Sequence, residues 1–152
     1  MTPEDNVASL WKAIKNIGQT FGEVREYQKS IKFLQMALDI ALENSKISIS
    51  AEAWNNEFVA TYLELGKSYR YMGEANTAEQ MFLKGVKIGA ESKSATPELR
   101  FYETLIWSAI TDLYMELHQW SEAEQFAQKC DDRYPNDPLF QLQLEQAKSR
   151  LK

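Results

Sequence analysis

The chain has 152 residues, of which 44% are hydrophobic and 26% are charged, with a net charge of −5 at pH 7. This composition is typical of one folded domain with a continuous core, and it argues against disorder and against broad binding to nucleic acid or anionic membranes. No apolar run approaches the roughly 20 residues of a membrane-spanning helix and the first residues do not resemble a signal peptide, so we expect a cytoplasmic protein.

Apolar residues recur at spacings of three and four along most of the chain, as on the buried face of a helix. The pattern predicts an all-α fold without a substantial sheet. Residues 45–50 alternate like a strand, but the stretch is short and has no partner strand, so we interpret it as a helix end and connector. We place helices near residues 3–22, 26–47, 51–72, 75–92, 97–117, 121–132 and 138–151.

Helix starts and turns fit these positions. Ser121 to Glu124 has the sequence of a capping box, which predicts that Ser121 begins the sixth helix. Gly22, Gly73 and His118 occupy or adjoin the expected turns, where glycine and, less often, histidine accept left-handed backbone. Three other helices start with a capping side chain followed by proline, namely Thr2–Pro3, Thr96–Pro97 and Asp137–Pro138.

The last helix is amphipathic in sequence. We predict that its apolar residues form the buried face and that this helix covers one end of the domain, rather than serving as a docking peptide for another protein. The predicted buried residues are Leu139, Leu142, Leu144, Ala147 and Leu151, and the predicted exposed ones are Gln141, Gln143, Glu145, Lys148 and Arg150.

One spacing of apolar, glycine and aromatic positions occurs three times. The copies are Ile14-x-x-Ile17-Gly18-x-x-Phe21, Tyr62-x-x-Leu65-Gly66-x-x-Tyr69 and Trp107-x-x-Ile110-Thr111-x-x-Tyr114. A small residue follows nine residues after the final aromatic. A residue of variable size follows four residues later, and another small residue follows three residues after that. These are Ser30, Leu34 and Ala37, then Ala78, Phe82 and Gly85, then Ala123, Ala127 and Cys130. Such matching of large and small residues predicts helical hairpins, with Gly18 and Gly66 as points of close contact.

This pattern resembles the tetratricopeptide repeat, and the resemblance covers nearly the whole chain. Thr111 and Ala127 depart from the glycine and aromatic of the repeat, and Ile14 and Ser30 are weaker substitutes. The copies lie 48 and 45 residues apart, so the chain looks most like the long-helix branch found in kinesin light chains and cell-polarity adaptors. The resemblance implies a right-handed superhelix of three hairpins, at about 3–47, 51–92 and 97–132, with a capping helix at about 138–151.

Gly66-Lys67-Ser68 matches the end of a phosphate-binding loop only superficially. Thr61 stands where the first glycine of such a loop is required, and no strand precedes it. Phe58, Tyr62, Leu65 and Tyr69 instead continue a helical face through this segment. We therefore expect Lys67 and Ser68 to lie within a helix and to bind no nucleotide.

The sequence shows no catalytic constellation. Cys130 stands at a small-residue position of the third copy, which predicts burial, and His118 stands in a turn without an evident partner carboxylate. One cysteine and one histidine supply neither a disulfide nor a zinc site. We expect no enzymatic activity, no metal and no cofactor.

The resemblance also implies a binding surface, because the first helix of each hairpin lines the concave face in that family. Lys67, Arg70 and Tyr71 are the strongest candidates there, since arginine and tyrosine are enriched among binding hot spots. Basic residues in the first two copies and acidic ones in the third predict a ligand with an acidic segment followed by an apolar or basic one. The predicted groove residues are Lys12, Lys15, Gln19, Leu63, Lys67, Arg70, Tyr71, Ser108, Asp112, Met115 and Glu116.

Three functions fit these features. The first is a module that binds a peptide segment of a partner protein without chemistry. The alternative is a regulator that responds to a short peptide or small metabolite, and the third is a structural role with self-association, although we expect a monomer. The lysine–asparagine–arginine clamp of chaperone-binding relatives is not reproduced, because Gln19, Ser108 and Asp112 do not match it even if Lys15 is one arm.

Overall fold

The computed structural model describes residues 3–44, 51–92 and 96–152, and the statements below concern that part of the chain. It is helical throughout its regular structure, without a strand in these ranges. The seven helices are α1 (Pro3–Glu23), α2 (Tyr27–Asn44), α3 (Ala51–Tyr71), α4 (Ala75–Glu91), α5 (Pro97–Glu116), α6 (Trp120–Arg133) and α7 (Pro138–Arg150). Each predicted helix is confirmed, with ends that differ by at most one residue. The exception is the end of the second helix, because residues 45–50 lie outside the described ranges.

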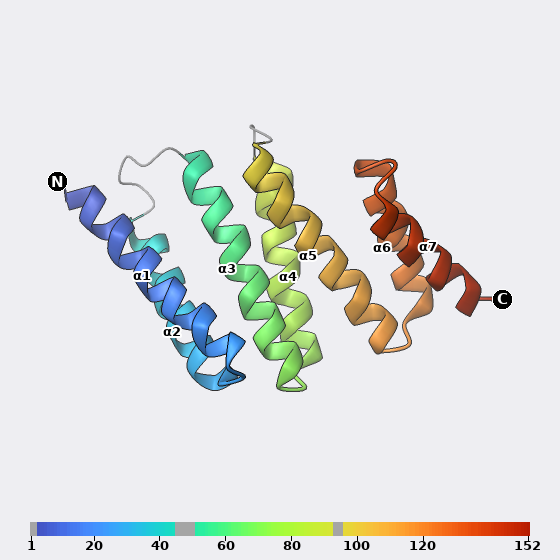
Figure 1. Cartoon of the computed structure of the whole chain (residues 1–152), viewed down its shortest axis with the longest axis horizontal. Helices are drawn as coiled ribbons and strands as arrows, with labels where there is room; N and C mark the ends of the chain where they lie inside the picture. The colour runs from blue at the N-terminus through green and yellow to red at the C-terminus, as the bar shows by residue number, and fades with distance from the viewer. Residues whose placement is uncertain (1–2, 45–50, 93–95) are drawn as a thin grey trace.

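The helices form two layers. Helices α1, α3, α5 and α7 lie side by side nearest the viewer in Figure 1, and α2, α4 and α6 lie behind them. Each hairpin packs through its own two helices, and α3 and α5 also contact the front helix before them and the rear helix of the preceding hairpin. The two termini lie at opposite ends of the row (Figure 1). One long surface is therefore made by the front helices alone.

The three turns within hairpins share one hydrogen-bonding pattern. In each, a residue with left-handed backbone follows the helix, and the next N–H donates to the carbonyl of the aromatic five residues earlier. The left-handed residues are Arg25 (φ 65°), Gly73 (φ 82°) and His118 (φ 58°). The bonds run from Glu26 to Phe21 at 2.8 Å, from Glu74 to Tyr69 at 2.9 Å and from Gln119 to Tyr114 at 2.8 Å. The final aromatics of the three sequence copies are therefore equivalent in the structure.

Two of the four predicted helix starts are confirmed. Thr96 accepts a hydrogen bond from the backbone N–H of Leu99 at 3.1 Å, and Asp137 accepts one from Leu139 at 3.0 Å. Thr2 lies outside the described residues. The predicted start at Ser121 is wrong, because α6 begins at Trp120 and its N-cap is Gln119, whose side chain makes no capping bond. The preceding turn fixes this start, since the Ala123 N–H already donates to the Gln119 carbonyl.

Size matching between helices explains the glycine in the second copy. A Cβ at Gly66 would overlap the ring of Phe82, which is fully buried. In the third copy the sizes are reversed: Thr111 replaces the glycine, and the small Ala127 replaces the phenylalanine. Both residues are fully buried. The departure of the third copy from the repeat pattern is therefore a paired exchange, which keeps the volume between the helices filled.

The predicted buried face of α7 is confirmed for Leu144 and Ala147 and is wrong for Leu139, Leu142, Gln143 and Leu151. Phe140, Gln143, Leu144 and Ala147 are buried, whereas Leu139, Leu142 and Leu151 are exposed. Gln143 Nε2 donates to the Ser108 carbonyl, to Ser108 Oγ and, at 2.8 Å, to Asp112 Oδ1, and these bonds offset the cost of burying the Gln143 amide. As predicted, α7 packs on the last hairpin, against α5 and α6.

Within the described residues, none of the helices combines the length and the apolar character needed to cross a membrane.

Candidate functional site

A cavity of about 390 Å³ lies on the surface of the front layer and is lined by residues of α1, α3 and α5. Seven of the eleven predicted groove residues line it: Gln19, Leu63, Lys67, Arg70, Tyr71, Ser108 and Asp112. They meet because positions three or four apart share one face of a helix, and α3 and α5 pack side by side. We call this surface the groove.

A second cavity, of about 460 Å³, adjoins the groove toward the first hairpin. Glu64, Lys67 and Tyr71 line both cavities, so these three side chains form the boundary between them. Tyr71 is 64% exposed, and its ring stacks on that of Tyr27 with centroids 5.2 Å apart. The stacking holds an exposed aromatic ring in place between two hollows, where it offers apolar area to a ligand at little entropic cost.

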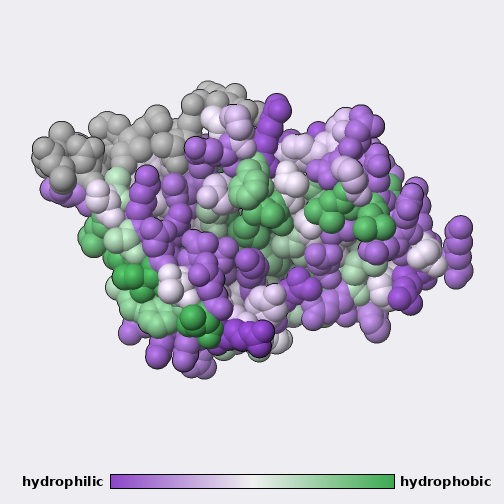
Figure 2. All heavy atoms as spheres, viewed as in Figure 1, coloured by the Kyte–Doolittle hydropathy of each residue, from purple (hydrophilic) through white to green (hydrophobic). Residues whose placement is uncertain are grey.

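The other wall of the groove is apolar. Phe101 is 61% exposed and Leu105 is 41% exposed, and both line the cavity with Tyr102. Figure 2 shows a hydrophobic patch over the N-terminal half of α5, bordered by hydrophilic residues. Phe101 and Leu105 are absent from the predicted groove residues, although Leu105 stands three residues before Ser108 and Phe101 stands four residues before Leu105, which places both on the predicted face.

Acidic neighbours compensate three of the four cations of the predicted site. Lys15 Nζ lies 2.8 Å from Glu57 Oε2, and Lys67 Nζ lies 3.5 Å from Glu64 Oε1. Arg70 Nε donates to Glu116 Oε2 at 2.6 Å, which links α3 to α5. The groove therefore combines ion pairs with exposed aromatic rings. An acidic ligand would compete with the internal carboxylates for the cationic side chains.

Four predicted residues do not line the groove cavity. Lys12 and Lys15 lie further toward the start of α1, where Lys12 lines a separate cavity and the Lys15 ammonium stands 5.5 Å from the Trp11 ring centroid. Met115 packs against the core, and Glu116 acts only through its ion pair with Arg70. Two residues that do line it, Ser108 and Asp112, are held by Gln143 of α7.

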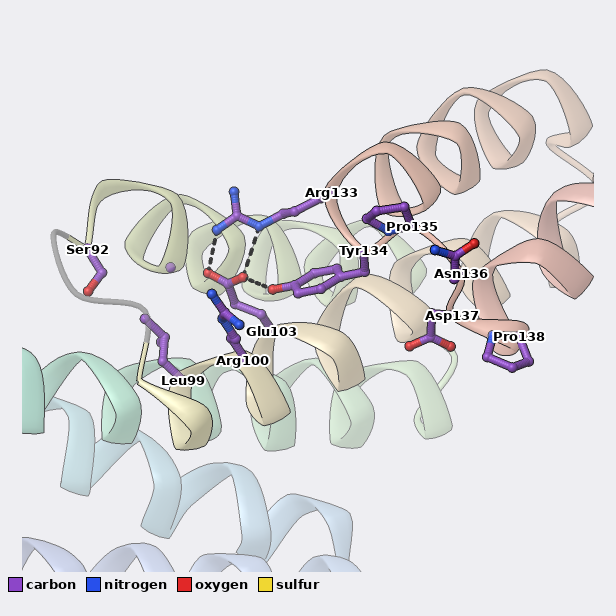
Figure 3. Close-up of a pocket in the computed structure, with 11 residues that line it drawn as sticks. Ser92, Leu99, Arg100, Glu103, Arg133, Tyr134, Pro135, Asn136, Asp137 and Pro138 are labelled. Atoms are coloured by element: carbon purple, nitrogen blue, oxygen red, sulfur yellow. Dashed lines mark hydrogen bonds and ion pairs between the residues drawn. The ribbon is translucent and has the colours of Figure 1, made fainter.

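A larger cavity, of about 760 Å³, lies on another part of the surface, between the end of α4, the start of α5 and the α6–α7 connection (Figure 3). At about 1.5 Å per residue, the 14 residues of α6 span less than the 20 residues of α5, so α6 does not extend over the first turns of α5. Figure 3 shows Glu103 at the floor of this cavity, with Arg133 and Tyr134 reaching it from the end of α6.

Glu103 is only 2% exposed, and both its oxygens are occupied. Arg133 Nη2 donates to Oε1 and Arg133 Nε donates to Oε2, each at 3.0 Å, and the Tyr134 hydroxyl also donates to Oε2. Burial, with the hydrogen bond to Glu103, raises the pKa of Tyr134 to about 12. The hydrogen bond with Tyr134 raises the pKa of Arg133.

This cluster joins helices. A Cβ at Gly89 of α4 would come within 2.5 Å of Glu103 Oε1, so the carboxylate lies directly against α4 while it binds the end of α6. Because both of its oxygens already accept hydrogen bonds from Arg133 and Tyr134, Glu103 is suited to holding α4, α5 and α6 together rather than to proton transfer.

Cys130 and His118 stand where the sequence places them. Cys130 is fully buried, and burial raises the pKa of its thiol to about 12, which keeps it protonated and unreactive. His118 lies in the turn before α6, with its ring stacked on Trp120 at a centroid distance of 5.1 Å. Across the described ranges, the histidine, cysteine and acidic side chains form no group of three suited to a metal ion.

Comparison with models of known protein families finds no match, and a search of curated proteins finds no similar sequence.

Proposed function

We propose that the chain is a non-enzymatic interaction module of the cytoplasm that binds a peptide segment of a partner protein in the groove. The observation that supports this most directly is the convergence of Lys67, Arg70 and Tyr71 with the exposed Phe101 and Leu105 around one hollow. Exposed aromatic and apolar side chains beside arginine and lysine are the composition of binding hot spots.

The proposed architecture is a tetratricopeptide-like stack of three hairpins and a capping helix, wound as a right-handed superhelix. The repeated turns at Arg25, Gly73 and His118 and the two-layer packing support it. In such a stack the groove would lie on the inner surface, where an extended or helical peptide is bound along the row of front helices.

The expected ligand combines an apolar anchor with an acidic side chain. The anchor would lie between Tyr71 and Phe101, and the carboxylate would pair with Arg70 or Lys67 in competition with Glu116 and Glu64. Since these internal pairs are at least partly exposed, exchanging one carboxylate for another costs little.

The test is affinity capture from the native cell extract with Arg70→Glu and Tyr71→Ala beside the unchanged protein. Both variants are expected to lose the same partner, and Lys87→Glu, a charge reversal exposed on the rear layer, is expected to retain it. Circular dichroism and thermal melting check that all variants remain folded. Capture that is equal in all four proteins would refute the groove as the binding site.

A further inference from the structure

Helix α1 forms one end of the row of front helices, and its outer side is apolar (Figure 1). Leu10 and Ile17 on this side are 54% and 43% exposed, and Ala13 and Thr20 are exposed as well. Figure 2 shows hydrophobic residues along the edge of the molecule that α1 forms. Within the described residues α1 packs on α2 and α3 alone, and neither covers these four side chains. We call the surface that they make the end face.

The same four positions are buried in the second and third sequence copies. Their equivalents, none of them more than 9% exposed, are Phe58, Thr61, Leu65 and Ser68 in α3 and Glu103, Ile106, Ile110 and Leu113 in α5. The rear helix of the preceding hairpin covers them. Ser68 Oγ donates to Ser30 Oγ of α2 at 3.1 Å, and Ile106 lies directly against Gly85 of α4. The end face is therefore the packing surface of a front helix without the helix that covers it elsewhere in the chain.

The end face and the residues that border it carry no charge. Over three turns of α1 this side of the helix presents Ser9, Leu10, Ala13, Asn16, Ile17 and Thr20. Lys15 instead points toward the second hairpin, where it pairs with Glu57 of α3. An uncharged apolar surface suits an apolar partner, and it can also face a copy of itself because no like charges are brought together.

The end face offers both a projecting side chain and a hollow. A cavity of about 270 Å³ is lined by Asn16, Ile17, Thr20 and Phe21. Leu10 projects from the same side of the helix, since it stands seven residues, or two turns, before Ile17. The hollow and the leucine are too far apart on one helix to meet, but two copies of the helix can each supply the leucine that fills the hollow of the other.

We propose that the chain associates with a second copy of itself through the end face, with the two α1 helices antiparallel about a two-fold axis. Leu10 of each copy enters the hollow beside Thr20 of the other, and the symmetry makes this contact twice. The same alignment places Ile17 opposite Ala13, so a large residue again faces a small one, as it does between hairpins. The spacings of three and four between these residues are those of the interlocking positions of a coiled coil.

This association departs from the monomer that the sequence predicts, and it is separate from the groove. The groove residue of α1 is Gln19, which lies on a different side of the helix from Ile17. Ile17→Lys is therefore expected to capture the groove partner as the unchanged protein does. Failure of self-association and failure of peptide binding would be distinguished by this variant.

Sedimentation equilibrium of the full chain measures its mass against concentration. We expect a monomer–dimer equilibrium with a dissociation constant on the order of 10–100 μM, because three helical turns bury less than the roughly 1,600 Å² of a standard interface. Ile17→Lys is expected to weaken the association about tenfold or more, since it buries a charge in an apolar contact. The matched control is Leu142→Lys, at an exposed leucine of α7 at the opposite end, which should dimerise like the unchanged protein.

Circular dichroism checks that both lysine variants remain folded. A protein that stays monomeric up to about 1 mM, well above the constant expected for an interface of this size, would overturn the proposal. So would growth of the mass beyond a dimer, or loss of association in Leu142→Lys with association retained in Ile17→Lys.

Cysteine cross-linking tests the antiparallel alignment. Pairing position 10 with position 20 puts the two-fold axis at position 15, so two copies of Asn16→Cys lie close together and are expected to form a disulfide-linked dimer under mild oxidation. Two copies of Ser9→Cys lie about 21 Å apart along the paired helices and should stay unlinked. Cys130 is fully buried and does not compete. Equal cross-linking at both positions would indicate parallel helices and overturn the proposed arrangement.

Discussion

Phe82 of α4 fills the space that a side chain at position 66 of α3 would need, since a Cβ built on Gly66 overlaps its ring. The ring is fully buried, so it has no open space into which to turn. This contact fixes how closely the two helices of the second hairpin approach. The corresponding neighbour of Gly18 is Leu34, whose Cγ lies 2.7 Å from the position of such a Cβ, which is a smaller overlap than the one between a Cβ at position 66 and the Phe82 ring.

Gly66→Ala is therefore expected to lower the free energy of unfolding by about 1–3 kcal/mol, because overpacking strains a filled core despite the better helix propensity of alanine. Gly18→Ala should cost less. Urea unfolding followed by circular dichroism measures both. In a double-mutant cycle, Gly66→Ala should cost less in a Phe82→Leu background, and strictly additive effects would contradict the proposed clash.

Glu103→Ala tests the joining of α4, α5 and α6. The change removes the acceptor for the Arg133 guanidinium and for the Tyr134 hydroxyl, so we expect a loss of about 1.5–3 kcal/mol in unfolding free energy. Glu145→Ala, an exposed change on α7, serves as the control and should stay within about 0.5 kcal/mol. Equal stability of the two variants would mean that the Glu103 cluster contributes nothing to the fold.

The sequence was sufficient to predict the helices because their ends depend on local chemistry. Thr96 and Asp137 cap helices through bonds to residues two or three positions away, and the turns at Gly73 and His118 need left-handed backbone at one site. The face of each front helix was also predictable, because it follows from a spacing of three and four.

The features that the sequence did not predict depend on contacts between residues that lie far apart in the chain. The burial of Gln143 is compensated by hydrogen bonds to Ser108 and Asp112 of α5, so hydrophobicity alone predicted only part of the buried face of α7. Two cations of the predicted site, Lys15 and Arg70, meet carboxylates that lie 42 and 46 residues away in the sequence, and no local pattern marks such pairs.

Alkaline pH is expected to destabilise the protein through groups that burial keeps neutral. Burial, with Glu79 nearby, raises the pKa of Tyr114 to about 12, and burial with Glu103 does the same for Tyr134. A folded-state pKa above the ordinary tyrosine value of 10.0 means that the stabilisation is complete below pH 10 and is lost as the pH rises toward 12. Each group contributes a slope of at most about 1.4 kcal/mol per pH unit.

Urea titrations between pH 9 and 11.5 measure this loss. Tyr134→Phe should flatten the decline of unfolding free energy above pH 10, although it lowers stability at neutral pH by removing the hydrogen bond to Glu103. A decline that is unchanged in Tyr134→Phe and Tyr114→Phe would show that neither hydroxyl is responsible.

Cys130 offers a second measure of burial in the third hairpin. Because its thiol is fully buried and its pKa is raised to about 12, the native protein is expected to react very slowly with a thiol reagent such as 5,5′-dithiobis(2-nitrobenzoate) at pH 8. In urea the thiol is exposed and should react at once. The Ala127→Gly variant, which loosens the neighbouring turn of α6, should react faster than the unchanged protein, and rapid labelling of the folded unchanged protein would contradict the packing.

The ion pair between Arg70 and Glu116 leads to a prediction about ligand preference that stability alone would not reveal. Glu116 is more than half exposed, so Glu116→Gln should alter the unfolding free energy by less than about 1 kcal/mol. The change releases the Arg70 guanidinium from its carboxylate partner, and a ligand carboxylate would then bind it without competition.

If the groove holds an acidic peptide, Glu116→Gln is expected to raise the affinity for that peptide several-fold at low salt, and Arg70→Gln is expected to lower it. Fluorescence anisotropy with a captured peptide at 20 mM and 300 mM NaCl measures both effects, and high salt should reduce the difference between the variants because the site is exposed. An affinity that falls in both variants would indicate that the intact ion pair, and not the free cation, shapes the site.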